Sequence, residues 1–123
     1  MELDTKIYLV DENGEKFMGI GVLWLLEAIG DGYSLRSAAA KMNLSYSKAY
    51  SMLNRLEKTV GINFVEHKRG GAQRQGVVLT DFARSYIELY KDFQRKAKSA
   101  SYAVFKEYKK KVDELIEENA KDD

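Results

Sequence analysis

The sequence predicts a mainly α-helical protein with small β-hairpins and a long C-terminal helix. Apolar residues recur at three- and four-residue spacings through most of the 123 residues, which is the period of a helix. Two pairs of short strand-like runs flank turn-forming segments. Neither glycine nor proline occurs after Gly76, so nothing interrupts a last helix. The length suits one compact domain with an extension.

A β-hairpin is expected at the N-terminus. Residues 5–10 alternate Ile7 and Leu9 with outward positions, and residues 15–18 form the returning strand. Between the two strands, Asn13 and Gly14 supply the positive-φ positions of a tight hairpin turn.

A buried helix is expected after this hairpin. It begins after Gly19, carries Leu23, Leu26 and Ile29 at helical spacing and stops at the glycines of residues 30–32. Trp24 lies in this apolar helix and is assigned to the core.

Two more helices follow, joined by a short polar turn. Ser34 is expected to cap the first of them, which runs to Asn43, and Ser45 the second, which ends at Val60 and Gly61. This is the layout of a helix-turn-helix, because the second helix presents polar and cationic side chains outward. These outward residues are Tyr46, Ser47, Lys48, Tyr50, Ser51, Asn54 and Arg55.

A second hairpin is predicted after these helices. Residues 64–66 and 77–79 have the character of strands, and the glycine-rich loop between them carries Lys68, Arg69 and Arg74. A cationic loop of this kind suits a wing that follows the DNA backbone or enters a narrow minor groove. The alternative is an exposed, solvated loop.

A long helix is predicted from its cap, Thr80, towards the end of the chain. An apolar stripe with an eleven-residue period stays on one face of an almost straight helix. Because such a stripe extends beyond a small domain, it needs a partner to cover it. Residues 113–123 are expected to fray. The stripe comprises Phe82, Tyr86, Leu89, Phe93, Ala97, Ala100, Val104, Tyr108 and Leu115.

The charge of the chain is unevenly distributed although its formal net value is only +1. Residues 1–33 carry a net charge of −5, residues 34–75 of +6 and residues 76–123 of 0. Positive charge is therefore concentrated where phosphate binding requires it. With no cysteine, no leader sequence and no long apolar run, the chain is expected to be cytoplasmic, with no membrane partner.

Double-stranded DNA is the predicted partner. A helix that enters the major groove places short polar and cationic groups at its N-terminal turns, where they reach base edges and phosphates. The predicted DNA-binding residues are Ser45, Tyr46, Ser47, Lys48, Ser51, Arg55, Lys68, Arg69 and Arg74.

Several motifs in this order resemble a known family. Leu44-Ser45-Tyr46-x-x-Ala49-Tyr50, Phe64-Val65-Glu66, Gly70-Gly71 and Leu79-Thr80 are similar to the N-terminal domain of the molybdate-responsive regulators (ModE), and less closely to the DNA-binding domain of LysR-type regulators. The resemblance covers residues 5–92. It implies a winged helix-turn-helix over residues 1–79, a dimerisation helix over residues 80–123 and a homodimer that reads two half-sites.

No enzymatic role, cofactor or metal site is expected. The family's oxyanion-binding domains follow the long helix, so the resemblance implies no molybdate site within these residues. P-loop, GxSxG and HExxH patterns do not occur, and His67, the only histidine, has no partner at ligand spacing. Glu12, Glu15 and Asp31 are interpreted as solvated charges in turns.

Sequence-specific binding of double-stranded DNA and transcriptional regulation as a homodimer is therefore the predicted function. The alternative is a winged-helix protein–protein interaction module that does not bind DNA.

Overall fold

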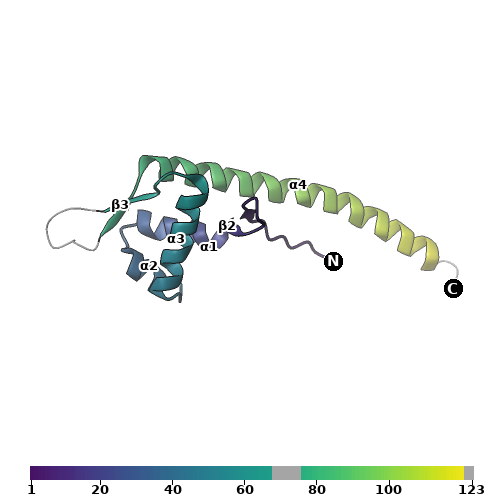
Figure 1. Cartoon of the computed structure of the whole chain (residues 1–123). Helices are drawn as coiled ribbons and strands as arrows, with labels where there is room; N and C mark the ends of the chain where they lie inside the picture. Colours follow the sequence, from purple (N-terminus) through teal and green to yellow (C-terminus); the bar gives the residue numbers. More distant parts are fainter. Residues whose placement is uncertain (68–75, 121–123) are drawn as a thin grey trace. The chain divides into compact units, whose positions relative to one another are not determined.

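The computed structural model describes residues 1–67 and 76–120. By their contacts they form two compact units, one of residues Ile7–Leu89 and one that joins Met1–Lys6 to Tyr90–Asp123. Four helices and two antiparallel two-stranded sheets among the described residues confirm the predicted mainly helical class. The elements are, in order, β1 (Leu9–Val10), β2 (Lys16–Met18), α1 (Ile20–Gly30), α2 (Leu35–Lys41), α3 (Tyr46–Val60), β3 (Val65–His67), β4 (Val77–Leu79) and α4 (Asp81–Ala120) (Figure 1).

The β1–β2 hairpin is shorter than predicted and has a different turn. Its loop is closed by two backbone hydrogen bonds, from Gly14 N–H to the Asp11 carbonyl at 3.0 Å and from Asp11 N–H to the Glu15 carbonyl at 2.8 Å. Only Gly14 in this turn has a positive φ, 82°, and Asn13 does not. The predicted Asn-Gly turn is therefore wrong. The Asp11 carboxylate accepts from the N–H groups of Asn13 and Glu15, which favours a type I turn followed by a left-handed glycine.

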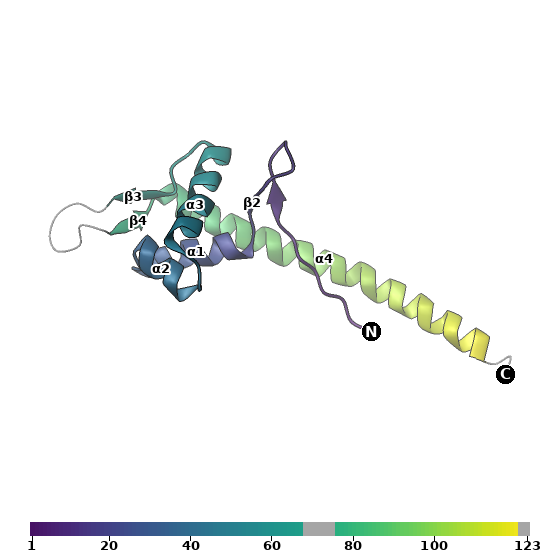
Figure 2. The ribbon, with the colours of Figure 1, turned by 60° about the horizontal axis from the view of Figure 1, so that its bottom comes forward.

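Helix α1 forms the centre of the Ile7–Leu89 unit, because it contacts α2, α3, β2 and β4 (Figure 2). Trp24 was predicted to lie in the core, and this is wrong, since its side chain is 55 % exposed. The helix is apolar almost all round, so hydrophobicity alone does not reveal which side is left uncovered. The buried residues of α1 are Val22, Leu23, Leu25, Leu26, Ala28 and Ile29.

The predicted serine caps of α2 and α3 are confirmed. The Ser34 hydroxyl accepts a hydrogen bond from Ser37 N–H, and the Ser45 hydroxyl accepts one from Lys48 N–H, each at 3.0 Å. These bonds satisfy backbone donors that a helix leaves free in its first turn, and they fix the residue at which each helix begins.

The C-terminal ends of α2 and α3 use left-handed residues. Helix α2 ends at Lys41, before the predicted Asn43, and Asn43 itself turns the chain with φ 58°. Helix α3 ends as predicted at Gly61, whose φ is 84° and whose N–H donates to the Glu57 carbonyl at 2.8 Å. Glycine adopts this conformation without steric cost.

The side chain of Phe64 packs the β3–β4 hairpin against the beginning of α4. Strand β3 begins one residue later than predicted, and Phe64, just before it, is fully buried. Its ring packs edge-on against Phe82 and Tyr86, with ring centroids 5.4 and 5.0 Å apart. Edge-to-face pairs of this kind add to the stabilisation that burial provides.

The Glu57 side chain holds α3 against the same hairpin. Its carboxylate accepts hydrogen bonds from the backbone N–H groups of Phe64, at 2.7 Å, and Val65, at 3.3 Å. A charged acceptor makes a stronger bond to a backbone N–H than a neutral one does. The end of α3 and the start of β3 are therefore held together by hydrogen bonds between a side chain and the backbone.

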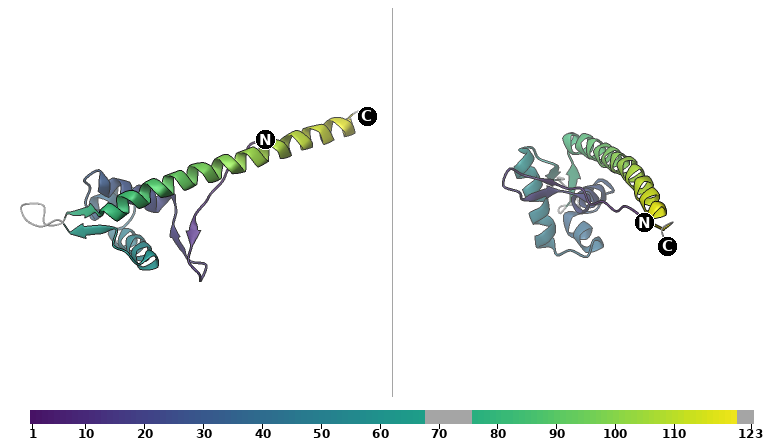
Figure 3. Two further views of the ribbon diagram at one scale, coloured as in Figure 1. Left: turned by 90° about the horizontal axis from the view of Figure 1, so that it is seen from above. Right: turned by 90° about the vertical axis from the view of Figure 1, so that its right-hand side faces the viewer.

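Helix α4 is one unbroken helix of 40 residues (Figure 3). Thr80 caps it as predicted, because its hydroxyl accepts from Ala83 N–H at 3.1 Å. The expected fraying from residue 113 is wrong as far as Ala120. A pair such as Lys109 and Asp113, 3.2 Å apart, supports the last turns. No helix in the described part of the chain, α4 included, is both long and apolar enough to cross a membrane.

The predicted stripe of α4 divides into two parts. At its beginning, Phe82 and Tyr86 pack against Phe64. Further along, Val104 is 69 % exposed and Leu115 is 59 % exposed, so the described residues leave this part of the stripe uncovered.

Candidate nucleic-acid interface

Helix α3 presents three parallel rows of side chains on its outward surface. Residues spaced by three, four or seven positions lie above one another on a helix, which assigns each side chain to a row. The central row comprises Ser47, Ser51, Asn54 and Lys58; one flanking row comprises Lys48 and Arg55; the other comprises Tyr46, Tyr50 and Glu57. All of these side chains except the half-buried Glu57 are exposed.

The central row is short, polar and cationic. Ser47, Ser51 and Asn54 offer hydroxyl and amide groups that both donate and accept hydrogen bonds. Lys58 extends this row with an ammonium group and was missed by the sequence prediction. The seven-residue spacing from Ser51 to Lys58 was the signal that would have identified it.

The row of Lys48 and Arg55 faces the β1–β2 hairpin. A guanidinium nitrogen of Arg55 lies 3.9 Å from a carboxylate oxygen of Glu15. Glu15, Lys48 and Arg55 also line a common cavity of about 330 Å³. Glu15 was interpreted from the sequence as a solvated charge. The structure gives it a cationic partner, although its side chain stays 65 % exposed.

The aromatic row faces α2 and the β3–β4 hairpin. The rings of Tyr46 and Tyr50 lie 6.2 Å apart, and the guanidinium carbon of Arg36 lies 4.5 Å from the centre of the Tyr46 ring. Arg36, Tyr46 and Tyr50 line an open cavity of about 780 Å³ together with His67. Arg36 comes from α2 and was missed by the sequence prediction, because its contact with Tyr46 depends on how two helices pack.

The serine that caps α3 keeps part of its hydrogen-bonding capacity. The Ser45 oxygen accepts from Lys48 N–H, which leaves its own O–H to donate. A hydroxyl at the positive end of a 15-residue helix is suited to an anion such as phosphate.

The structure thus gathers six of the nine predicted site residues at α3. They are Ser45, Tyr46, Ser47, Lys48, Ser51 and Arg55. The other three, Lys68, Arg69 and Arg74, lie outside the described residues. His67 is exposed at the end of β3, and among residues 1–67 and 76–120 no group of three acidic, histidine or cysteine side chains is placed to hold a metal ion.

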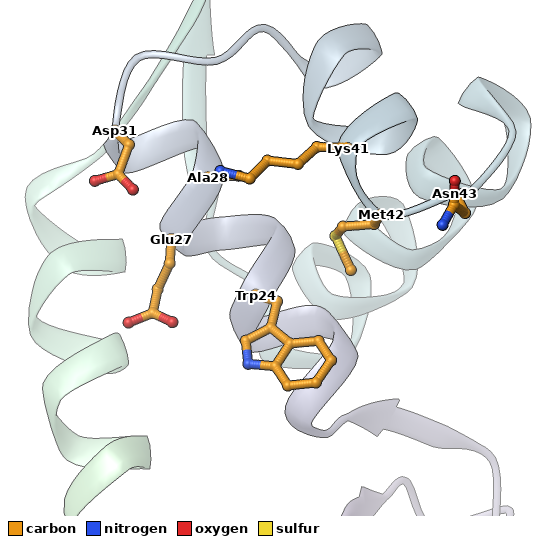
Figure 4. A pocket seen from close by; sticks show the side chains of 7 residues that line it. All are labelled: Trp24, Glu27, Ala28, Asp31, Lys41, Met42 and Asn43. Atoms are coloured by element: carbon orange, nitrogen blue, oxygen red, sulfur yellow. The ribbon is translucent and has the colours of Figure 1, made fainter.

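A separate cavity of about 460 Å³ lies between α1 and the end of α2 (Figure 4). Trp24 and Ala28 line it from α1, and Met42 lines it from the turn after α2. Near its rim, the Lys41 ammonium lies 3.2 Å from the Tyr33 hydroxyl and 4.5 Å from the centre of that ring. This cavity does not share residues with the surface of α3.

Comparison with known proteins finds neither a protein-family model nor a curated protein that matches the chain.

Proposed function

We propose that this chain is a winged helix-turn-helix protein that binds double-stranded DNA sequence-specifically and regulates transcription as a homodimer. The observation that carries the proposal is the outward surface of α3. Its central row of small polar groups lies between a cationic row and an aromatic row. Few surfaces other than a nucleic-acid interface need this combination on one exposed helix.

In this proposal α3 enters the major groove. A helix of 15 residues is about 22 Å long, enough to lie along the edges of several base pairs. Ser47, Ser51 and Asn54 contribute to the reading of bases, because hydroxyls and amides match the donors and acceptors of base edges. Ser45, Lys48 and Arg55 bind phosphates or bases beside that row.

The groups around α3 hold the DNA backbone. Arg36, stacked on Tyr46, places a cation beside the N-terminal part of α3, and the β3–β4 hairpin acts as the wing. Lys68, Arg69 and Arg74 fall in the sequence between β3 and β4 and are proposed to add phosphate or minor-groove contacts. The net charge of +6 over residues 34–75 supports this distribution of roles.

The homodimer is proposed to form through the exposed stripe of α4. An apolar row along a 40-residue helix that residues 1–67 and 76–120 leave exposed costs free energy in water. A second copy offers the same row, so a two-fold pair buries both. Two copies of α3 would then read two half-sites of one operator.

Replacement of Lys48 by alanine tests the proposed interface. We expect Lys48→Ala to weaken binding to random duplex DNA and to lower the slope of log K against log salt by about 1, because one phosphate contact is lost. The measurement is a fluorescence-anisotropy titration at several salt concentrations. Lys106→Ala, which removes the same charge from the exposed surface of α4, is the matched control and should bind like the wild type.

Salt-insensitive binding, or none, by the wild-type chain would contradict DNA binding. It would favour the second candidate function, a protein–protein interaction module. The exposed Trp24 beside its cavity supports that candidate, because tryptophan is enriched at protein interfaces.

A further inference from the structure

The β1–β2 hairpin brings acidic side chains against the cationic flank of α3. Glu15 pairs with Arg55 at 3.9 Å. Asp11 and Glu12 line a cavity together with Lys58, and Asp11 lines another with Arg55 and Lys58. The acidic turn of the β1–β2 hairpin thus meets the proposed DNA-binding helix within the Ile7–Leu89 unit.

Glu15 is held in place by the turn that precedes it. The backbone of Glu15 is fixed twice, because its N–H donates to the Asp11 carboxylate at 3.0 Å and its carbonyl accepts from Asp11 N–H at 2.8 Å. One oxygen of the Asp11 carboxylate, Oδ1, accepts hydrogen bonds from the N–H groups of Asn13 and Glu15. The Glu15 carboxylate forms an ion pair with a cation of α3, Arg55.

We propose that Glu15 limits the affinity of α3 for arbitrary DNA sequences by pairing with Arg55. Non-specific affinity comes from cations that neutralise phosphates. The Glu15 carboxylate competes with phosphate for Arg55 and repels a backbone that approaches the same flank. This inference rests on the proposed DNA-binding function and deepens it.

The same carboxylate also opposes binding at an operator. At an operator, hydrogen bonds of α3 to base edges fix the position of the helix. Those contacts favour the correct sequence alone, whereas the carboxylate opposes every sequence alike. An operator retains base contacts that offset this loss of affinity, whereas an arbitrary sequence does not.

Glu15→Gln tests this role, because it removes the charge and keeps the shape of a side chain that is already 65 % exposed. We expect affinity for random-sequence duplex DNA at low salt to rise about two- to fivefold, the range set by one exposed ion pair. The slope of log K against log salt becomes steeper, because Arg55 gains a phosphate contact. Fluorescence anisotropy measures both quantities, and circular dichroism checks that the variant keeps its helices.

Two further variants separate this role from a general charge effect. Glu118→Gln makes the same change in net charge on the exposed C-terminal part of α4, and it should bind like the wild type. In an Arg55→Gln background, the addition of Glu15→Gln should have little further effect if Glu15 acts through Arg55.

The inference is wrong if Glu15→Gln binds random duplex no better than the wild type or no better than Glu118→Gln, or if its effect persists undiminished without Arg55. In each of these cases the salt-sensitive binding of the wild type leaves the proposed function intact. If the wild type and all variants lack salt-sensitive binding, the proposed function fails, and this inference fails with it.

Discussion

Arg36 and Tyr46 illustrate how one side chain can prepare another for binding. The guanidinium of Arg36 rests over the Tyr46 ring, with 4.5 Å between the guanidinium carbon and the ring centre. An arginine stacked in this way has already lost part of its rotational freedom, and its N–H groups, which lie in the plane of the guanidinium, can still donate hydrogen bonds. Such a cation loses less entropy when it binds a phosphate.

Arg36→Ala should therefore weaken DNA binding by about fivefold, the equivalent of about 1 kcal/mol. The expected loss is similar for operator and random DNA, because a phosphate contact carries no sequence information. A competition titration with both duplexes measures it. Arg84→Ala is the matched control, since Arg84 is paired with Asp81 at 3.4 Å on α4 and has no proposed role in binding. Equal affinities of Arg36→Ala and the wild type would exclude a role for Arg36.

Single residues were predictable from the sequence where local rules decide their role. The caps Ser34, Ser45 and Thr80 follow from hydrogen bonds to the next turn of their own helix, and all three were predicted. Trp24 was assigned wrongly and Arg36 was missed, because exposure and stacking depend on which elements pack together. Periodicity of the chain does not contain this information.

Among the elements, α4 shows most clearly what the sequence can predict and what it cannot. Its start followed from Thr80 and its length from the absence of glycine and proline. Its persistence to Ala120 was not predicted, because an acidic terminal segment was expected to unwind. Pairs of opposite charge four residues apart, such as Lys109 with Asp113, offset the repulsion between its carboxylates.

The exposed stripe of α4 leads to a prediction at this scale. Val104→Asp places a charge in the proposed dimer interface, where burial of an unpaired carboxylate is costly. We expect the dimer to dissociate into monomers, with a dissociation constant raised by at least about tenfold. Sedimentation equilibrium over a range of concentrations measures the change.

Ser99→Asp provides the control for this experiment. Ser99 is exposed on α4 and lies away from the stripe, so an aspartate there should leave the oligomeric state unchanged. A wild-type chain that stays monomeric at all concentrations would show that the stripe has a different partner. Dimers of Val104→Asp as stable as those of the wild type would place the dimer interface elsewhere.

At the scale of the whole molecule, the stability of the Ile7–Leu89 unit depends on side-chain packing between its elements. Phe64 belongs to neither a helix nor a strand, yet it is fully buried and touches the rings of Phe82 and Tyr86. The class and order of the elements were predictable because each has its own period and its own turn signals. The contact at Phe64 was not, since it joins Phe64 to two aromatic residues of a separate segment, α4.

Phe64→Ala should lower the free energy of unfolding by about 3–5 kcal/mol, the usual effect of emptying a large buried site. Urea denaturation followed by near-ultraviolet and far-ultraviolet circular dichroism measures this loss. Ile62→Ala is a suitable comparison in the same segment, because Ile62 is 46 % exposed and should have a much smaller effect. A similar loss of unfolding free energy in both variants would mean that the buried Phe64 ring stabilises the unit no more than the exposed Ile62 side chain does.

The hydrogen bonds of Glu57 to the start of β3 determine which residues of α3 can be substituted without loss of the contact between α3 and the hairpin. The partners of Glu57 are the backbone N–H groups of Phe64 and Val65, so this contact between α3 and the hairpin does not involve the central row of α3. Ser47, Ser51 and Asn54 take no part in these hydrogen bonds. Their identities can therefore be exchanged, in evolution or by design, to change the base preference of the proposed DNA-binding surface while this contact between α3 and the hairpin stays the same.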